Sequence, residues 1–488
     1  MRLLFYHLRK KGLPTPPWNP VLGNLPVMAE LQKKGPSDTR QAESFALLST
    51  ETPGLEAGFY IDVWPFSCPM LVVTSPTMAI EACQTYDLPK PDVLQQYINP
   101  MAGGSDNLFV SNGAHWKKAR ELFNHGFSMT DSLSHVSGIL EEAEVFVKML
   151  NIHAQTGDIF SLDQLTCRYV MDIIGNVALN TRFNHLEQHN PIAAAMRDTI
   201  ELECGIEAGN FLERWSPRRL YRQWQNGRTM NHLIGVELEK RFQEWKQNEA
   251  KSLTFCSKSI MDIVISEYMK SRPREQQHLD PKFKSWATIQ MRLFLVFGAG
   301  ASSACQVLRE RPQTINQLPY THAIVKETLR LFPPANGLRG GLPHVSLRDE
   351  HGRSFPTEGC AIWIVHTAVH RNPAFWPEPH SFIPERWLVE QGHPLYPPAG
   401  GWRPFEHGPR NCIGQNLSLL GIITTLAMVV RQFDFHDAYA EYDGLNPSDG
   451  IKTMFGERAY MIQKGSGHPA QGFPCKVTVV PQTGQKEA

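Results

Sequence analysis

One ten-residue stretch, from Phe405 to Gly414, constrains this chain more than any other. It places Cys412 between two glycines and just before an apolar run from Leu417 to Val430. That run has the length of a helix but is shorter than the ~20 residues that a membrane span needs. The cysteine is therefore expected where a loop meets the start of a buried helix. Backbone N–H groups and the positive end of the helix dipole point to such a position, and both favour a thiolate.

The distribution of cysteines argues against a zinc site. The chain has nine cysteines, an odd and scattered set without a Cys-x-x-Cys pair, so neither a disulfide framework nor a tetrahedral zinc site is indicated. A single thiolate can be the one protein ligand of haem iron. The usual alternative is a buried, inert thiol, which we expect for the other eight cysteines. Near Cys412, Arg410 offers a fixed cation to an anionic group beside it.

The pattern F-x-x-G-x-R-x-C-x-G resembles the haem-thiolate loop of the cytochrome P-450 superfamily at each fixed position. Two further segments support the resemblance: Lys326 to Arg330 is similar to the family's E-x-x-R helix, and Pro384 to Trp387 to its P-E-R-F segment. The resemblance implies one large, mainly α domain with a small β region over residues 27–488. A short apolar N-terminus and a proline-rich hinge, residues 1–26, would precede it.

The resemblance also implies roles for individual residues. Cys412 would be the axial ligand of haem b and its iron. The residues that would bind the haem with it are Trp116, Arg120, Arg339, Phe405, Arg410 and Gly414. A buried triad that fixes the cysteine loop would consist of Glu327, Arg330 and Arg386. The substrate would be lined by Phe297, Ala299, Ala335, Asn336 and Leu338. Taken alone, the Trp116–Arg120 pair and the Glu327–Arg330 pair could each be ordinary surface contacts between helical neighbours.

The segment from Phe283 to Ser303 predicts a buried helix, because its second half is apolar on all sides. Gly298 and Gly300 weaken a helix by ~1 kcal/mol each relative to alanine, which usually marks a close approach or a local opening. The segment is similar to the family's long central helix, which delivers protons to bound oxygen. The alignment puts Ser303 at the position of a catalytic threonine and Ser302 at that of an acid. Ser302 thus lacks the carboxyl group.

The central helix of this chain is predicted to be cut short. Only 26 residues separate Gly300 from Glu327. By comparison with the family, roughly 30 to 40 residues are missing after Ser303, including the second half of the central helix. Exposed apolar faces of its neighbours would cost ~25 cal/mol per Å². We therefore expect either an alternative or misassembled product, or a fold that is patched locally.

Other segments predict ordinary structural elements. Two short strands are expected between Phe59 and Val73, and an amphipathic helix between Ile139 and His153. Ile234 to Asn248 carries charges on most faces and predicts a solvated helix. His366 and His370 occupy no recognised ligand position and are expected to be hydrogen-bonded core histidines.

Charge and the N-terminus bear on partners and location. The 48 basic and 48 acidic residues give a formal net charge of zero, which argues against a nucleic-acid partner. Lys117 and Lys118 are candidates for docking an acidic reductase. Residues 1–8 are mostly apolar and three cations follow, so we expect weak attachment to the cytoplasmic face of the endoplasmic reticulum membrane. A soluble cytoplasmic protein with a frayed N-terminus is the alternative.

The resemblance therefore implies a haem-thiolate monooxygenase that would insert one oxygen atom from O₂ into an apolar organic substrate. Electrons would come from NADPH through a separate reductase, since no flavin-binding domain fits in the chain. The segment from Tyr169 to Asn176 resembles fungal members, which suggests secondary metabolism. Two alternatives stay open: a haem-binding pseudoenzyme or non-functional deletion product, and a haem-thiolate isomerase or dehydratase that needs neither O₂ nor reductase. The missing acid at Ser302 is compatible with both.

Overall fold

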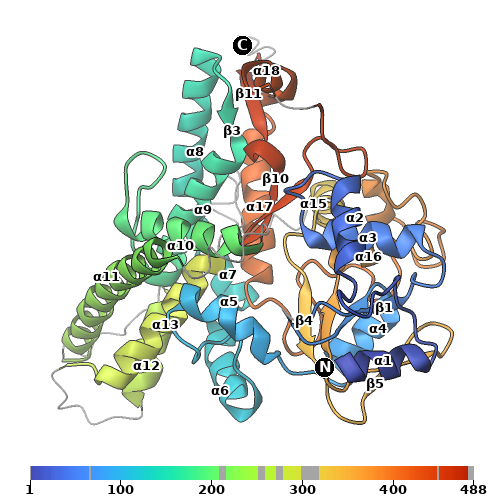
Figure 1. Ribbon diagram of the computed structural model, residues 1–488. Helices are drawn as coiled ribbons and strands as arrows, with labels where there is room; N and C mark the ends of the chain where they lie inside the picture. Colours follow the sequence, from blue (N-terminus) through green and yellow to red (C-terminus); the bar gives the residue numbers. More distant parts are fainter. Residues whose placement is uncertain are drawn as a thin grey trace.

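The helices of one half of the molecule pack around a large apolar core. The computed structural model describes residues 2–64, 67–207, 216–250, 259–270, 278–297, 318–447 and 450–481. The helices gathered on the left of Figure 1 are α5 (Asp92–Ala102), α6 (Gly113–Asn124), α7 (Met129–Ser134), α8 (Val136–Thr156), α9 (Leu162–Leu179), α10 (Pro191–Glu207), α11 (Pro217–Ala250), α12 (Ile260–Lys270) and α13 (Pro281–Phe297). Between these helices and the other half of the molecule runs α17 (Gln415–Val429), in orange and red.

A small mixed sheet organises the other half. Its strands follow the order β1 (Gly58–Ile61), β2 (Met70–Val73), β7 (Ala361–Ile364) and β4 (Gly337–Gly340). β2 and β7 are parallel, while the two outer pairs are antiparallel. The helices of this half are α1 (Arg2–Lys10), α2 (Leu25–Lys34), α3 (Gln41–Glu51), α4 (Pro76–Ile80), α15 (Pro319–Leu331) and α16 (His366–Arg371).

Short elements complete the described structure. The remaining strands are β3 (Phe160–Ser161), β5 (Ser346–Arg348), β6 (Ser354–Pro356), β8 (Phe433–Asp437), β9 (Met461–Lys464), β10 (Ser466–Pro469) and β11 (Pro474–Val479). They form a sheet of order β3-β11-β8 and two hairpins. The remaining helical pieces are α18 (Tyr439–Leu445), the π-helix Glu81–Thr85, and the 3₁₀ turns His125–Phe127, Pro384–Trp387 and Ala470–Gly472. The fold is thus mainly α with a small β part, as the sequence predicted.

Local chemistry explains several helix ends. Ser161 accepts a hydrogen bond from the Gln164 N–H and so caps α9. Gly157 ends α8 in the left-handed conformation, with φ of 65°.

The prediction of two strands between Phe59 and Val73 is confirmed by β1 and β2. The predicted break after Ser303 lies within 298–317, outside the described residues.

The prediction of a solvated helix over Ile234–Asn248 was wrong in one respect. Four side chains spaced four residues apart on α11 are fully buried: Met230, Ile234, Leu238 and Phe242. They form one narrow stripe that packs into the large core, while the charged residues occupy the rest of the surface. Counting charges over the whole segment concealed this stripe, because a helix needs only one apolar face to dock.

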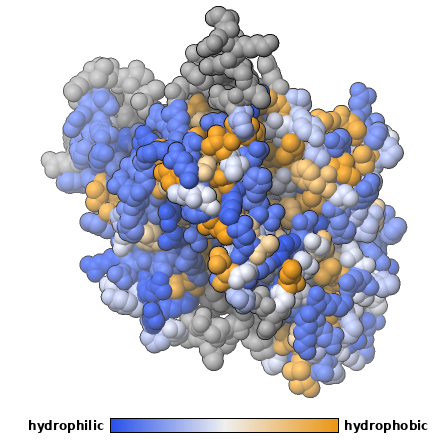
Figure 2. Space-filling view, turned by 90° about the horizontal axis from the view of Figure 1, so that it is seen from above, coloured by the Kyte–Doolittle hydropathy of each residue, from blue (hydrophilic) through white to orange (hydrophobic). Residues whose placement is uncertain are grey.

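The N-terminal segment is folded against the sheet half. Phe5 and Leu8 of α1 are buried, whereas Leu3 and Tyr6 are exposed. The proline-rich stretch that follows runs beside β1, since the Tyr60 N–H donates to the Pro14 carbonyl. None of the helices in the described ranges is long and apolar enough to cross a membrane. On the face in Figure 2, apolar residues lie in small groups among hydrophilic ones, a common pattern for protein surfaces.

Candidate active site

The cysteine loop is held in shape by its own backbone. The Cys412 N–H donates to the Phe405 carbonyl at 2.7 Å, which closes the loop just before α17 begins at Gln415. Gly408 has φ of 82°, and a Cβ atom there would lie 2.1 Å from the Cys83 carbonyl oxygen. Only glycine fits this close approach. The two fixed glycines of the pattern therefore have different structural roles: Gly408 allows the loop to turn, and Gly414 is the N-cap of α17.

The Cys412 thiol is exposed and yet desolvated. Its side chain is exposed to solvent, but burial among protein atoms raises its pKa. Both observations hold for a side chain that faces a concave, protein-lined space. The Gly414 N–H and the Arg120 guanidinium lower the pKa, but desolvation outweighs them. The sequence correctly indicated an N–H group at the start of the helix. It favoured a thiolate, that is, a lowered pKa of Cys412, whereas burial raises the pKa of the free thiol. A bound metal ion deprotonates a coordinating thiol outright.

Helix α6 contacts the cysteine loop through two of the predicted residues. Arg120 donates to the carbonyl and the side-chain oxygen of Asn411, at 2.8 and 2.7 Å. Trp116 is buried, and the Arg410 guanidinium lies over its ring at 4.0 Å from the centroid. Arg410 also donates to Ser111 and Asn112, which precede α6. Trp116 and Arg120 thus both bind the loop rather than each other.

Arg339 forms a second cluster of charges behind the loop. It lies on β4, is fully buried, and has one guanidinium nitrogen 3.5 Å from the Glu406 carboxylate. Glu406 is shared with His366 at 3.0 Å and Arg403 at 2.9 Å. These partners hold the pKa of Glu406 well below its usual range despite its burial. The Nε atom of Arg339 has no hydrogen-bond partner among the described residues, and Nη2 has only the 3.5 Å ion pair to Glu406.

Positive charge exceeds negative charge at this site. Burial and the neighbouring Arg339 lower the pKa of Lys90 to about 7. Burial and the same neighbour lower the pKa of Arg410 to about 10. Glu406, the acid in contact with Arg339, is already divided among three basic partners. Cations that depress one another's pKa values fit an anionic group, such as a pair of carboxylates, placed between them.

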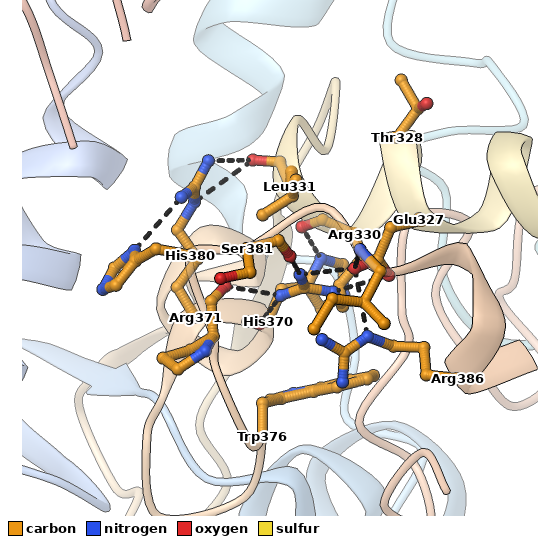
Figure 3. A network of polar contacts seen from close by, with 12 residues as sticks. Glu327, Thr328, Arg330, Leu331, His370, Arg371, Trp376, His380, Ser381 and Arg386 are labelled. Atoms are coloured by element: carbon orange, nitrogen blue, oxygen red, sulfur yellow. Dashed lines mark hydrogen bonds and ion pairs between the residues drawn. The ribbon is translucent and has the colours of Figure 1, made fainter. Parts of the chain in front are cut away.

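The predicted triad of Glu327, Arg330 and Arg386 comes together in a network of polar contacts (Figure 3). All three side chains are fully buried. Glu327 accepts from Arg330 at 2.8 and 2.9 Å and from Arg386 at 3.0 Å. The Trp387 indole and the Ile383 N–H also donate to it, each at 3.0 Å. Every carboxylate lone pair region is thereby used, which is the condition for burying such a charge.

A histidine connects this triad to the cysteine loop. His370 Nδ1 lies 2.9 Å from the Arg330 carbonyl oxygen, and His370 Nε2 accepts from the Arg403 N–H at 2.8 Å. Arg403 in turn binds Glu406 inside the loop pattern. Burial and nearby cations hold the pKa of His370 well below its usual value, so it is neutral and can accept. His366 and His370 are hydrogen-bonded core histidines, as expected.

The predicted substrate-lining residues are placed only in part. Ala335 is exposed, and Leu338 is half-buried on β4. The Asn336 side-chain oxygen accepts from the His366 N–H at 2.9 Å, which ties it to the protein. Phe297 is the last residue of α13, and its side chain is not described. Ala299, Ser302 and Ser303 lie outside the described residues.

Sequence reasoning missed four residues of this site: Lys90, His366 as a Glu406 partner, Arg403 and Glu406 itself. Glu406 and Arg403 lie within or beside the motif, at positions where the pattern fixes no residue type. The signal for them in the sequence was the placement of two charged residues close to the fixed Phe405. Lys90 gave no such signal, because its role depends on a contact with β4 across 249 residues of chain.

Comparison with known proteins identifies the family. The sequence pattern of the family described as Cytochrome P450 matches residues 13–309 and 306–451. The cytochrome P450 monooxygenase polC of Polytolypa hystricis is 34% identical, over 98% of this chain and 92% of its own length. The cytochrome P450 monooxygenase acrF of Aspergillus aculeatus is 28% identical, over 92% of this chain and 99% of its own.

The solved structure of the cytochrome P450DA heme domain has the same fold, with a TM-score of 0.68 over 96% of this chain and 98% of that one at 18% identity. The match with polC runs over 518 positions against 488 residues here, so at least 30 positions have no counterpart in this chain. The two family matches overlap at residues 306–309, next to the break that the sequence predicts between Ser303 and Gln306. The chain belongs to the cytochrome P450 family of monooxygenases.

Proposed function

We propose that Cys412 is the axial ligand of haem b and that the chain inserts one oxygen atom from O₂ into an apolar organic substrate. Family membership implies haem with a cysteine thiolate ligand and, in general, a redox partner and an apolar substrate. When bound, the haem would supply the oxygen chemistry, and the thiolate would favour cleavage of the O–O bond. The observation that carries the proposal is the desolvated yet exposed Cys412 thiol near a set of cations, of which Arg339 is fully buried and Arg410 and Lys90 are partly buried.

The cations around the loop are suited to bind the haem propionates. Arg339 has unused donor atoms in a fully buried position, and Arg410 is held rigidly over the Trp116 ring. Lys90 adds a third positive group, and a propionate beside it would raise its pKa again. Arg120 would then fix the cysteine loop through Asn411 and could add a further contact. Phe405 and Gly414 would shape the loop around the ligand.

The buried triad would act as a positioning device. The triad would fix the segment that leads to the loop. Hydrogen bonds of His370 to Arg330 and Arg403, and of Arg403 to Glu406, connect the triad to the loop. None of these groups needs to touch substrate. Their proposed work is to hold the Cys412 backbone still, since misplacement of a reacting group by about 1 Å can cost on the order of 10²-fold in rate.

Proton delivery would fall to Ser303, with Ser302 beside it. A serine hydroxyl can hold a water molecule, but it supplies a proton less readily than a carboxylic acid. Phe297, Ala299, Ala335, Asn336 and Leu338 would line the substrate. The fungal relatives support a role in secondary metabolism, and the substrate is proposed to be apolar overall.

Electrons are proposed to come from NADPH through a separate reductase. Lys117 and Lys118 are exposed on α6, whose other face contacts the cysteine loop. An acidic partner docked on these lysines would lie one helix away from the proposed ligand.

We propose that the protein lies at the cytoplasmic face of the endoplasmic reticulum membrane. It would be weakly attached through the exposed Leu3 and Tyr6 and the cations of residues 9–11.

The test is turnover of a panel of apolar substrates by the haem-loaded protein, with and without NADPH and a fungal reductase. The proposal predicts oxygenated product only when both are present, with the added atom carrying label from ¹⁸O₂. A rearranged product formed without NADPH would instead establish the isomerase or dehydratase alternative. Failure of every panel substrate, with haem bound and reducible, would favour the pseudoenzyme.

A further inference from the structure

A buried arginine on α13 has no acidic partner among the described residues. The Arg292 side chain is buried to 98%, since its relative exposure is 2%. It donates to the Asn231 side chain at 3.0 Å and to the Pro100 and Met101 carbonyls at 3.2 and 3.0 Å. Its Nε atom has no partner in the described part of the chain. A buried guanidinium is normally paired with an anion, because three neutral acceptors do not balance a desolvated charge.

The Arg292 guanidinium lies at a groove of about 800 Å³ bounded by α5, α11 and α13. Arg228 and His232 also line this groove, and no aspartate or glutamate does so among the described residues. Two acids on the neighbouring α10 are already engaged: Glu203 binds Arg219, and Asp198 binds Arg222. Desolvation alone lowers the pKa of Arg292 to about 10, in keeping with the lack of a described anion beside it.

Two glycines lie beside the Arg292 guanidinium, which itself fills the space next to Gly103. A Cβ atom on Gly103 would lie 2.2 Å from Nη1 of Arg292, so only glycine fits there. A Cβ atom on Gly227, in the interior of α11, would lie 3.6 Å from the same nitrogen, which is an ordinary contact. The packing therefore does not require Gly227, although glycine destabilises a helix interior relative to alanine.

The groove also offers apolar surface. Trp224 and Leu220 line it and are 56% and 48% exposed. Both lie on α11, one and two helical turns before Arg228, so they continue the groove away from the cationic end. A ligand that matches this surface has an anionic head for Arg292 and an apolar body for the two side chains.

We propose that this groove binds the carboxylate of an amphipathic organic acid, with the carboxylate on Arg292 and the apolar body against Trp224 and Leu220. That the acid is a substrate rests on the proposed function, because α13 is the helix similar to the family's central helix. Binding itself needs only the groove. The substrate class thereby narrows from apolar molecules to apolar molecules with one acidic end.

Decanoate, decan-1-ol and inorganic phosphate are suitable probes, with affinity measured by titration calorimetry on the haem-loaded chain. The unmodified protein should bind decanoate at least tenfold more tightly than decan-1-ol. The same preference should disappear in Arg292→Gln. Arg222→Gln, the same change on α11 outside the groove, should keep it. Phosphate at equal concentration should not displace decanoate.

Gly227→Asp provides a second test, in case Arg292→Gln is too unstable to study. The new carboxylate would pair with Arg292 from within the protein, so decanoate binding should fall at least tenfold while the melting temperature does not fall. Gly227→Ala is the matched control and should keep decanoate binding. Equal affinity for decanoate and decan-1-ol, tight decanoate binding in Gly227→Asp, or displacement by phosphate would each overturn the proposal.

Calorimetry uses neither reductase nor oxygen, so the two proposals can fail separately. Decanoate bound through Arg292 by a protein that oxygenates nothing would contradict the proposed function alone. Oxygenation of neutral substrates with no preference for decanoate would contradict the groove proposal alone.

Discussion

Arg120 donates two hydrogen bonds to Asn411, the residue immediately before Cys412. One bond goes to the backbone and one to the side chain, so the guanidinium fixes both the position and the rotation of this residue. Two segments distant in sequence are joined in this way, 291 residues apart. The loop that carries Cys412 is therefore ordered by the protein itself and not by a ligand alone.

Replacement of Arg120 should loosen this loop. Hydrogen bonds to a charged group contribute ~1.5–3 kcal/mol each, and Arg120→Ala removes two. We expect haem to leave the protein at least tenfold faster, as measured by transfer to an excess of a competing apoprotein. Lys117→Ala, on the exposed face of the same helix, is the matched control and should behave as the unmodified chain. An unchanged rate in Arg120→Ala would show that the contact does not order the site.

The buried triad should dominate stability in its neighbourhood. Glu327→Gln removes the charge that compensates Arg330 and Arg386, and breaking a buried pair in this way costs ~3–5 kcal/mol. Denaturant unfolding should show this loss. Glu385→Gln changes an exposed glutamate 3.2 Å from the Tyr320 hydroxyl and should cost little. If the two variants are equally stable, the triad has no structural role.

His185 should make the fold sensitive to acid. Burial lowers its pKa from 6.5 to about 4, so the unfolded chain binds the proton more readily. Its contribution to stability is full above pH 6.5 and is lost progressively as the pH falls towards 4. His185→Gln should therefore flatten the fall in unfolding free energy between pH 6.5 and 4. His351→Gln, at an exposed position, is the control, and an identical pH profile for all three proteins would contradict the assignment.

Oxygen chemistry in this chain should be poorly coupled. Acid–base assistance is typically worth ~10²–10⁴ in rate, and Ser302 lacks the carboxyl that would provide it. We expect more peroxide than product per NADPH consumed. Ser302→Asp should help little, because the segment that would support it is predicted to be missing, whereas insertion of the corresponding roughly 30 to 40 residues of a relative should help much more. Tight coupling in the unmodified chain, or full rescue by Ser302→Asp, would contradict this account.

The local sequence pattern was sufficient to predict contacts between residues that lie close together along the chain. The cysteine loop, the start of α17 and the Glu327–Arg330 pair are all encoded within ten residues, and the structure places them as the sequence predicted. Arg386 could be paired with them only through the resemblance to a family, because 59 residues separate it from Glu327.

Long-range electrostatics could not be predicted in the same way. The net direction of the Cys412 pKa depends on how many protein atoms surround the thiol, which no motif states. Lys90 enters the site through its proximity to Arg339, on a strand paired with β7. The buried stripe of α11 was hidden for a related reason, since composition averages over faces that the fold separates.

The most direct measurement is the Soret spectrum of the ferrous carbon-monoxide complex in Cys412→Ala. The unmodified chain should give the shifted band of a thiolate-ligated haem, and the variant should lose it, because among the described cysteines Cys412 has the exposed position next to Arg120. Cys360→Ala, a buried thiol at the end of the sheet, should keep the band. Survival of the shifted band in Cys412→Ala would contradict the assignment of the haem ligand and, with it, the proposed function.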